Sequence, residues 1–174
     1  KMLLDSLKEL PDQPLAFEIN DETLDILLYF QNGKFNFVGI NGSEYPQRAQ
    51  LSEIAKTISM DSSALLKGIN NTAFALADND LRPVMSGIYF DVHPEYVVFV
   101  ASDSQKLACF KNMSVQTGLQ TSFILPRKPA ALLKNILAKE SGDVTITFDE
   151  KNACFNLENF ILNCRLIEGN YPKY

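Results

Sequence analysis

The sequence predicts an α+β protein built from repeated units, each a helix followed by short antiparallel strands. Three segments with a helical pattern resemble one another: MLLDSL (residues 2–7), ALLKGI (64–69) and ALLKNI (131–136). Each precedes runs in which apolar and polar residues alternate, the period of a half-buried strand. An order of helix and then strands, repeated along the chain, predicts helices that cover one face of antiparallel sheets.

The first unit ends in a turn that leads away from its strands. LAFEIND (residues 15–21) and KFNFVGI (34–40) have the strand period, and INGSEYPQ (40–47) follows them. The Asn-Gly and Tyr-Pro pairs in that last stretch are typical of turns and extended exits.

In the second unit we expect a helix from about Ser62 to Ala77. Leu65, Ile69 and Leu76, among others, fall on one face at helical spacing. The strands GIYFDV (87–92), EYVVFVAS (95–102) and KLACFK (106–111) follow, with His93 and Pro94 in the turn between the first two.

The third unit repeats the first at a nearly constant offset. In ILPRKPAALLK (residues 124–134), Pro126 ends a strand and Pro129 lies in the first turn of a helix. A shift of 129 residues places LAFEIND on VTITFDE (144–150), and RLIEGNYPKY (165–174) repeats the exit of INGSEYPQ. The pattern favours duplication, although α+β proteins also reuse such units by convergence. Residues 53–170 have the length of one domain, and the first unit has the pattern of half of another.

Composition sets limits on the function. Of the 174 residues 46% are hydrophobic, and no apolar run approaches the roughly 18 residues of a membrane span. With no export leader visible, we expect a cytoplasmic protein that does not contact membranes. The net charge of −5 argues against tight gripping of nucleic acid through phosphates. Cys109, Cys154 and Cys164 lie in apolar strands without metal-ligand spacing, so we expect reduced, buried thiols.

No catalytic site, metal site or cofactor is predicted. The lone histidine, His93, lies in a turn, and the sequence has no Walker, dinucleotide-binding or zinc-protease motif. An unrecognised hydrolase would need His93 beside a serine or carboxylate in a cleft.

Four segments carry a resemblance to a known family. RPVMSGIYFDV, VVFVASDSQKLA, ILPRKPAALLKNIL and RLIEGNYPKY resemble the middle domain of the bacterial DNA polymerase III beta subunit, the sliding clamp family. The segment from KMLLDSLKELP to NGSEYPQ resembles the second half of that family's first domain. The resemblance implies a DNA-clamp fold, with residues 1–52 as the end of domain 1 plus a linker, 53–174 as domain 2, and domain 3 absent.

The resemblance also implies a function without catalysis. A sliding clamp is a DNA replication processivity factor, a ring-shaped homodimer around double-stranded DNA. It tethers the DNA polymerase III core, the clamp loader and repair polymerases, which insert short linear motifs into a pocket. A ring held by topology needs few phosphate contacts, which agrees with the acidic net charge. The alternative is a repeat-built scaffold domain that binds peptides and has no role on DNA.

Site residues follow by position in these motifs. The DNA-facing residues implied by motif position are Asn79, Arg82, Arg127 and Lys128, and the polar sides of the helices that would line the hole add Lys67 and Lys134. The implied wall of the partner pocket is Met85, Ser102, Ser104, Gln105, Lys106, Leu107 and Pro172. The implied dimer contacts are Phe35 and Phe37. A solvated helix face would explain the lysines equally well, and core packing would explain the two phenylalanines.

The pocket loop departs from the family pattern. SDSQKL (residues 102–107) stands where the family has a TDGHRL-like sequence, with Ser104 where glycine is common and Gln105 in place of histidine. The resemblance therefore implies that a pocket is kept, while its detailed preferences are open.

Overall fold

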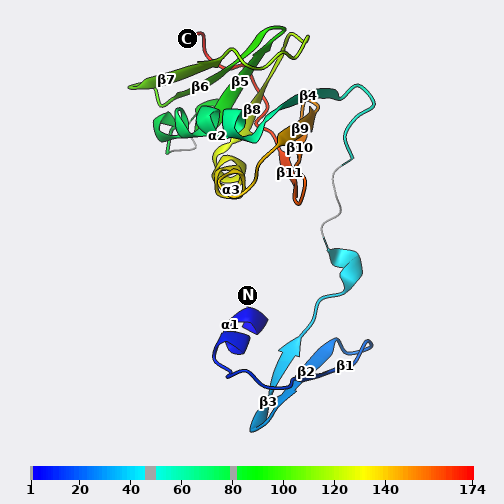
Figure 1. Ribbon diagram of the computed structural model, residues 1–174. Coiled ribbons are helices and arrows are strands. Elements are labelled where there is room, and N and C mark those ends of the chain that lie inside the picture. The colour runs from blue at the N-terminus through cyan, green and yellow to red at the C-terminus, as the bar shows by residue number, and fades with distance from the viewer. Residues whose placement is uncertain (1, 46–49, 79–81) are drawn as a thin grey trace. The chain divides into compact units, whose positions relative to one another are not determined.

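The computed structural model describes residues 2–45, 50–78 and 82–174. The chain divides into two compact units, Lys1–Gln47 and Arg48–Tyr174. Figure 1 shows the elements of each unit with their labels.

The first unit is a short helix with a three-stranded sheet. It contains α1 (Met2–Lys8), β1 (Ala16–Ile19), β2 (Asp25–Phe30), β3 (Gly33–Val38) and the 3₁₀ turn η1 (Gly42–Glu44). The strands are antiparallel in the order β1-β2-β3. Phe17, Leu28 and Phe35 are opposite one another in the register and therefore share a face. Leu28 is fully buried on that face, whereas Phe17 remains half exposed.

The second unit repeats one pattern, a strand and a helix followed by three strands. The first copy is β4 (Lys56–Asp61), α2 (Ser62–Asn70), β5 (Gly87–His93), β6 (Tyr96–Ser102) and β7 (Leu107–Asn112), with 3₁₀ turns η2 (Ala73–Ala75) and η3 (Pro83–Ser86). The second copy is β8 (Thr121–Pro126), α3 (Arg127–Leu137), β9 (Asp143–Phe148), β10 (Asn152–Asn156) and β11 (Ile161–Arg165).

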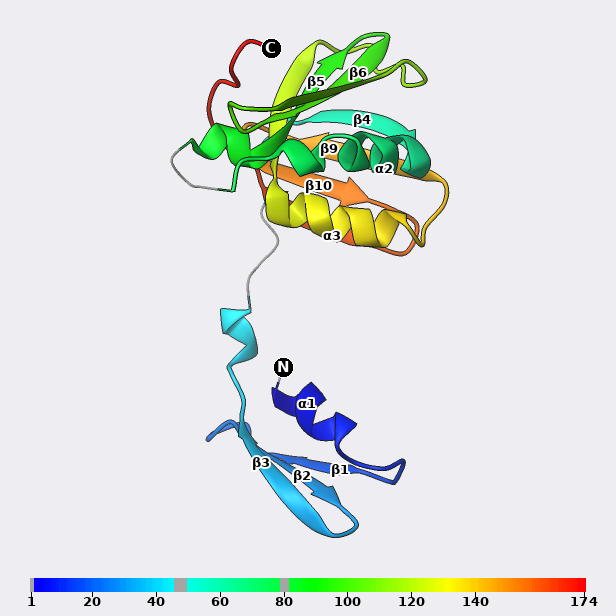
Figure 2. The same cartoon turned by 90° about the vertical axis from the view of Figure 1, so that its left-hand side faces the viewer.

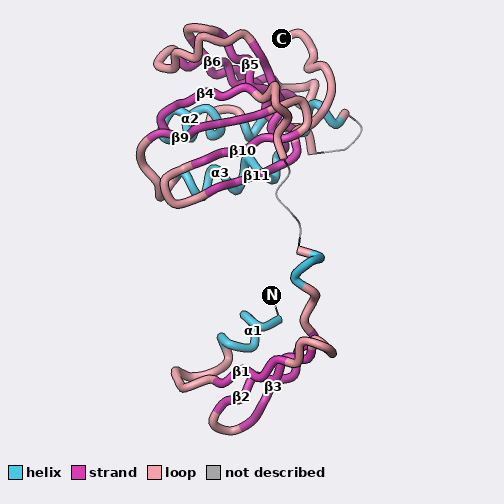
Figure 3. The backbone as a smooth tube through the Cα atoms, turned by 90° about the vertical axis from the view of Figure 1, so that its right-hand side faces the viewer, coloured by secondary structure: helices cyan, strands magenta, loops and turns pink. Residues whose placement is uncertain are grey.

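The two copies exchange their leading strands. The sheets have the orders β7-β6-β5-β8 and β11-β10-β9-β4, so β8 joins the strands of the first copy and β4 joins those of the second. Figure 2 shows α2 and α3 side by side in front of the strands, and Figure 3 shows the strands from the opposite side. The expected α+β class, with antiparallel sheets and helices on one face, is confirmed.

Aromatic side chains connect the two sheets. Phe90 of β5 lies 4.4 Å from Phe123 of β8, and Phe123 lies 4.4 Å from Phe148 of β9, measured between ring centroids. Leu65 of α2 and Leu133 of α3 are fully buried against this cluster. The helices therefore cover a core that both sheets share.

Two sequence expectations need correction. The helix expected to reach Ala77 ends at Asn70, because the buried Thr72 hydroxyl donates to the Gly68 carbonyl at 2.7 Å and the chain continues into η2. Strand β4 was not expected at all. Its signal is the alternation of Ile58 and Met60, which are buried between exposed neighbours.

The segment after β11 crosses from one sheet to the other. The Ile167 N–H donates to the Ile124 carbonyl of β8 at 3.0 Å. Gly169 then adopts a φ of +135°, and a Cβ there would lie 2.8 Å from Val84. Both observations explain a glycine in this position.

The cysteines differ in exposure. Cys154 is buried and Cys164 is half-buried, and burial raises the pKa of the Cys164 thiol to about 11. The expectation of burial is wrong for Cys109, which is exposed because it lies on the edge strand β7 and alternates with the buried Ala108.

α2 approaches Phe99 of β6 closely at Gly68, and this contact yields a test of the packing. A Cβ at Gly68 would overlap the ring of Phe99, which is fully buried and cannot move aside. We expect Gly68→Ala to lower the free energy of unfolding by about 1 to 2 kcal/mol, although alanine is the better helix former. Urea titration measures this, and Asn70→Ala on the exposed side of α2 is the control. Equal stability of the two variants would contradict the packing.

Candidate functional site

The loop of residues 102–107, between β6 and β7, is held by its own side chains. The Asp103 carboxylate accepts N–H groups from Gln105 at 3.0 Å and Lys106 at 2.9 Å, and it also binds the Lys106 amine. The Ser102 hydroxyl donates to the Lys106 carbonyl at 2.8 Å. These bonds give the 102–107 loop one conformation in which Leu107 begins the next strand.

The same bonds shift the ionisation of Asp103. The hydrogen bond from the Lys106 side chain, followed by the backbone N–H groups of Lys106 and Gln105, holds the pKa of the Asp103 carboxyl well below its ordinary range. The carboxylate therefore stays charged, and the loop stays bonded, throughout the physiological pH range.

Ser104 adopts a backbone conformation that favours glycine. Its φ is +78°, in the left-handed region, which fits the glycine common at this position of the resembled loop. Its N–H donates to the Ser102 hydroxyl at 3.2 Å. Its own hydroxyl lies 3.6 Å from the Met85 sulfur and accepts a hydrogen bond of 2.7 Å from Arg82.

The apolar part of this surface is Leu107, which is 54% exposed at the start of β7. Met85 is only 5% exposed, so it supports the loop from beneath and offers little surface of its own. Pro172 is exposed and follows Tyr171, whose ring stacks on Tyr89 of β5 at 4.8 Å. The described structure thus brings Met85 and the loop together, and it fixes Pro172 to the same unit through Tyr171.

The last residue, Tyr174, is hydrogen-bonded to strand β5. The Tyr174 hydroxyl donates to Asp91 at 2.6 Å, and burial followed by this hydrogen bond raises the pKa of Tyr174. His93 Nε2 lies 3.1 Å from the same Asp91 oxygen, and the His93 ring stacks on Tyr96. Among the described contacts, His93 thus has a carboxylate neighbour, one of the two partners that the hydrolase alternative calls for, and no serine.

The predicted DNA-facing residues do not form one group of free cations. Lys67 on α2 and Lys128 and Lys134 on α3 are exposed on the paired helices. Arg127 instead pairs with Asp78, and Arg82 bonds Ser104 in the 102–107 loop. Asn79 lies outside the described residues.

In the first unit, Phe35 and Phe37 lie on the face of the sheet that carries Leu28. Both are half-buried, and Phe35 packs at 4.9 Å on Phe30 and at 6.2 Å on Phe37. This placement fits packing in that unit, and the predicted dimer contact stays a prediction.

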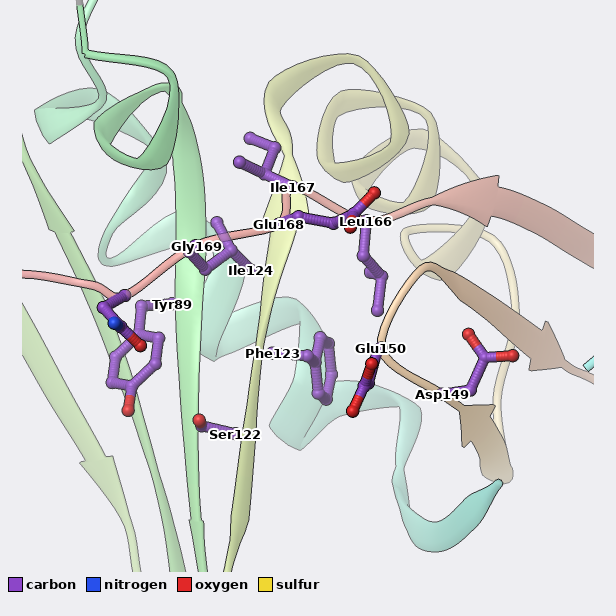
Figure 4. A pocket seen from close by; sticks show the side chains of 11 residues that line it. Tyr89, Ser122, Phe123, Ile124, Asp149, Glu150, Leu166, Ile167, Glu168 and Gly169 are labelled. Carbon is purple, nitrogen blue, oxygen red and sulfur yellow. The ribbon is translucent and has the colours of Figure 1, made fainter. Parts of the chain in front are cut away.

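A cavity of about 480 Å³ is lined by none of the predicted site residues and was not expected from the sequence. Figure 4 shows Tyr89 and Ser122 on one side and Glu150 on the other, with Glu168 on the crossing segment. Asp149 also lines it. Burial raises the Asp149 pKa, but N–H groups of Ser52, Lys151 and Asn152 outweigh burial and leave the pKa below its ordinary value.

Neither a metal centre nor a membrane helix is present in the part of the chain that the structure describes. Across residues 2–45, 50–78 and 82–174, no group of three or more His, Cys, Asp or Glu side chains is placed to hold a metal ion. Over the same ranges, no helix is long and apolar enough to cross a membrane.

Comparison with known proteins gives a consistent result. A family model described as "DNA polymerase III beta subunit, central domain" matches residues 59–173. The beta sliding clamp of Staphylococcus aureus (strain Mu50) is 27% identical over 172 residues, which cover 99% of this chain and 45% of that protein. The beta sliding clamp of Bacillus subtilis (strain 168) is 28% identical over 169 residues, covering 95% of this chain and 44% of the relative.

Solved structures agree. The crystal structure of the DNA polymerase sliding clamp from Bacillus subtilis matches with a TM-score of 0.83 and 25% identity, over 99% of this chain and 45% of the other. The chain thus spans about 45% of the length of these relatives.

The low pKa of Asp103 gives a test of the loop. A carboxyl whose pKa is lowered by folding stabilises the loop above its unfolded pKa, near 3.9, and loses that effect as the pH falls through the folded pKa. We expect the carboxyl carbon of Asp103, followed by NMR, to titrate below the ordinary midpoint. Lys106→Ala should raise the midpoint, whereas Lys111→Ala, whose amine lies over the Tyr96 ring, should not. An ordinary midpoint in the unaltered protein would contradict the bonding described.

Proposed function

The chain belongs to the DNA polymerase III beta subunit family, and we propose that it acts as part of a sliding clamp, a processivity factor in DNA replication. The observation that supports this best is the family match over residues 59–173, which covers both helices and all strands of the two interlocked sheets except the first half of β4. In this proposal residues 1–52 are the end of the first clamp domain with its linker, and 53–174 are the middle domain.

The proposed contact with double-stranded DNA is topological and non-specific. A homodimeric ring that surrounds the duplex is retained by closure, so it needs only weak, screened contacts with phosphates. Lys67, Lys128 and Lys134 are exposed on the paired helices and supply such contacts. The net charge of −5 suits a protein that slides along DNA and does not grip it.

The proposed second activity is docking of partner proteins at the 102–107 loop. The exposed Leu107 offers an apolar contact for the anchor of a short linear motif, and the polar loop offers hydrogen-bonding groups to its backbone. The partners in this proposal are the DNA polymerase III core, the clamp loader and repair polymerases. The protein acts in the cytoplasm as a non-catalytic subunit without a cofactor.

The docking proposal is tested at Leu107. Replacing Leu107 by Asp puts a charge at the apolar contact, and we expect the affinity of the intact protein for a clamp-binding peptide to fall by about 30-fold or more. Fluorescence anisotropy measures the affinity. Leu132→Asp is the matched control, because Leu132 is similarly exposed (53%) but lies on α3. Unchanged binding by the Leu107 variant would rule out this docking surface.

The DNA proposal is tested by topology. The intact protein should remain on circular duplex DNA at high salt and leave when the circle is cut, because closure and not charge retains it. Gel filtration of protein–DNA mixtures before and after cutting measures retention. Retention on linear DNA would indicate direct gripping, and absence from both forms would favour a peptide-binding scaffold without a role on DNA.

A further inference from the structure

The cavity of about 480 Å³ in the 48–174 unit continues into a second hollow. The second hollow, of about 180 Å³, shares Ser122, Asp149 and Glu150 with the first. The two form one elongated groove between β8 and the link that joins β9 to β10, which we call the β8 groove. The larger hollow alone is within the range of ligand sites, about 300 to 1,000 Å³.

The floor of the β8 groove is apolar and belongs to the core. Phe123 and Ile124 of β8 and Leu166 after β11 line the larger hollow, and each is at most 8% exposed. Because packing fixes these side chains, the groove is formed before a ligand binds. Ile54 lines the smaller hollow and is 80% exposed. An apolar side chain of a partner would therefore gain free energy by covering either part.

Two carboxylates of the groove are free to bind a ligand. Glu150 lies in the link between β9 and β10 and Glu168 on the crossing segment, and both are exposed (Figure 4). Among the described residues, no hydrogen bond or ion pair includes either carboxylate. Asp149 differs, because its carboxylate accepts three backbone N–H groups and maintains the link itself.

The groove has little positive charge of its own. Lys56 is the one cation among the described residues that line it, and its amine donates to the Thr121 hydroxyl at 2.9 Å. The negative potential of Glu150 and Glu168 is therefore complementary to a cationic ligand. An arginine fits better than a lysine, since a guanidinium pairs with a carboxylate through two N–H groups and packs on aromatic rings such as that of Tyr89.

We propose that the β8 groove is a second docking site, which binds an extended segment of a partner protein with an arginine between apolar residues. The arginine pairs with Glu150 and Glu168, and its apolar neighbours cover Ile124 and Ile54. The shape favours a peptide over a compact cation, because Glu150 is shared by both hollows and lies between their apolar linings. Binding here does not depend on docking at the 102–107 loop, since no residue of that loop lines the groove.

Three synthetic peptides, all labelled with fluorescein, test the proposal on the intact protein. The first has one arginine between two leucines, the second has citrulline in place of the arginine, and the third has serines in place of the leucines. None carries a clamp-binding motif. Citrulline keeps the shape of arginine without its charge. Because the two carboxylates are exposed, we expect the arginine peptide to bind about three- to tenfold more tightly than the citrulline peptide in fluorescence anisotropy. The serine peptide should also bind more weakly than the first.

Variants of the groove locate the binding. Glu150→Gln and Glu168→Gln should each lower the ratio of the arginine to the citrulline peptide, and the double variant should bring it to one. Glu158→Gln removes the same charge from an exposed position outside the groove and should leave the ratio unchanged. Ser122→Arg places a cation in the groove and should weaken binding of the arginine peptide. All four positions are exposed, and thermal unfolding checks that each variant is folded.

Leu107→Asp separates the β8 groove from the docking proposed at the 102–107 loop. This variant should bind the arginine peptide as the unaltered protein does. Loss of the arginine peptide in Leu107→Asp would place that peptide at the loop, which overturns the second site and leaves the docking function in place. Failure of a clamp-binding peptide to bind the unaltered protein, with the arginine peptide still bound, overturns the docking function and leaves the second site in place.

Three further outcomes overturn the second site. One is failure of the intact protein to bind the arginine peptide. Another is an unchanged ratio in the double variant of Glu150 and Glu168, since the carboxylates would then not recognise the arginine. The last is displacement of the labelled peptide by spermidine at the same concentration as by unlabelled peptide, which would show that the groove binds any cation.

Discussion

The two halves of the 48–174 unit exchange their leading strands, and the arrangement of the unit's surfaces depends on this exchange. Because β4 pairs with β9 and β8 pairs with β5, neither half can form its sheet without the other. The packed rings of Phe90, Phe123 and Phe148 fill the junction that this exchange creates. Folding of the two halves is therefore coupled, as expected when most of a core is made from contacts distant in sequence.

This constraint also positions the candidate docking surface. Strand β5 lies between β6 and β8, so the 102–107 loop at the end of β6 comes next to η3, which precedes β5. Arg82 and Met85 then meet Ser104 across the sheet edge. The crossing segment with Tyr171 packs on Tyr89 of the same β5. A rigid central strand thus holds three separate stretches of the chain in one region.

The pairing of the charges is consistent with a protein that slides on DNA. Two cations of the described residues are paired within the fold, Arg127 with Asp78 and Lys106 with Asp103. In the proposed function, exposed lysines on the paired helices supply a weak, salt-sensitive attraction for phosphates, which is sufficient if a closed ring prevents escape.

The order of the helices and most strands was predictable, because apolar periodicity records which side of an element faces the core. The repeat and the motifs also predicted the family and identified the 102–107 loop as a candidate site. The end of α2 was not predictable, since it depends on a hydroxyl of Thr72 that bonds back to Gly68. Three further features were not predictable from the sequence: the exchange of β4 and β8, the burial of Met85, and the bond between Arg82 and Ser104. The last three depend on contacts between residues far apart in the chain, and local periodicity carries no record of such contacts.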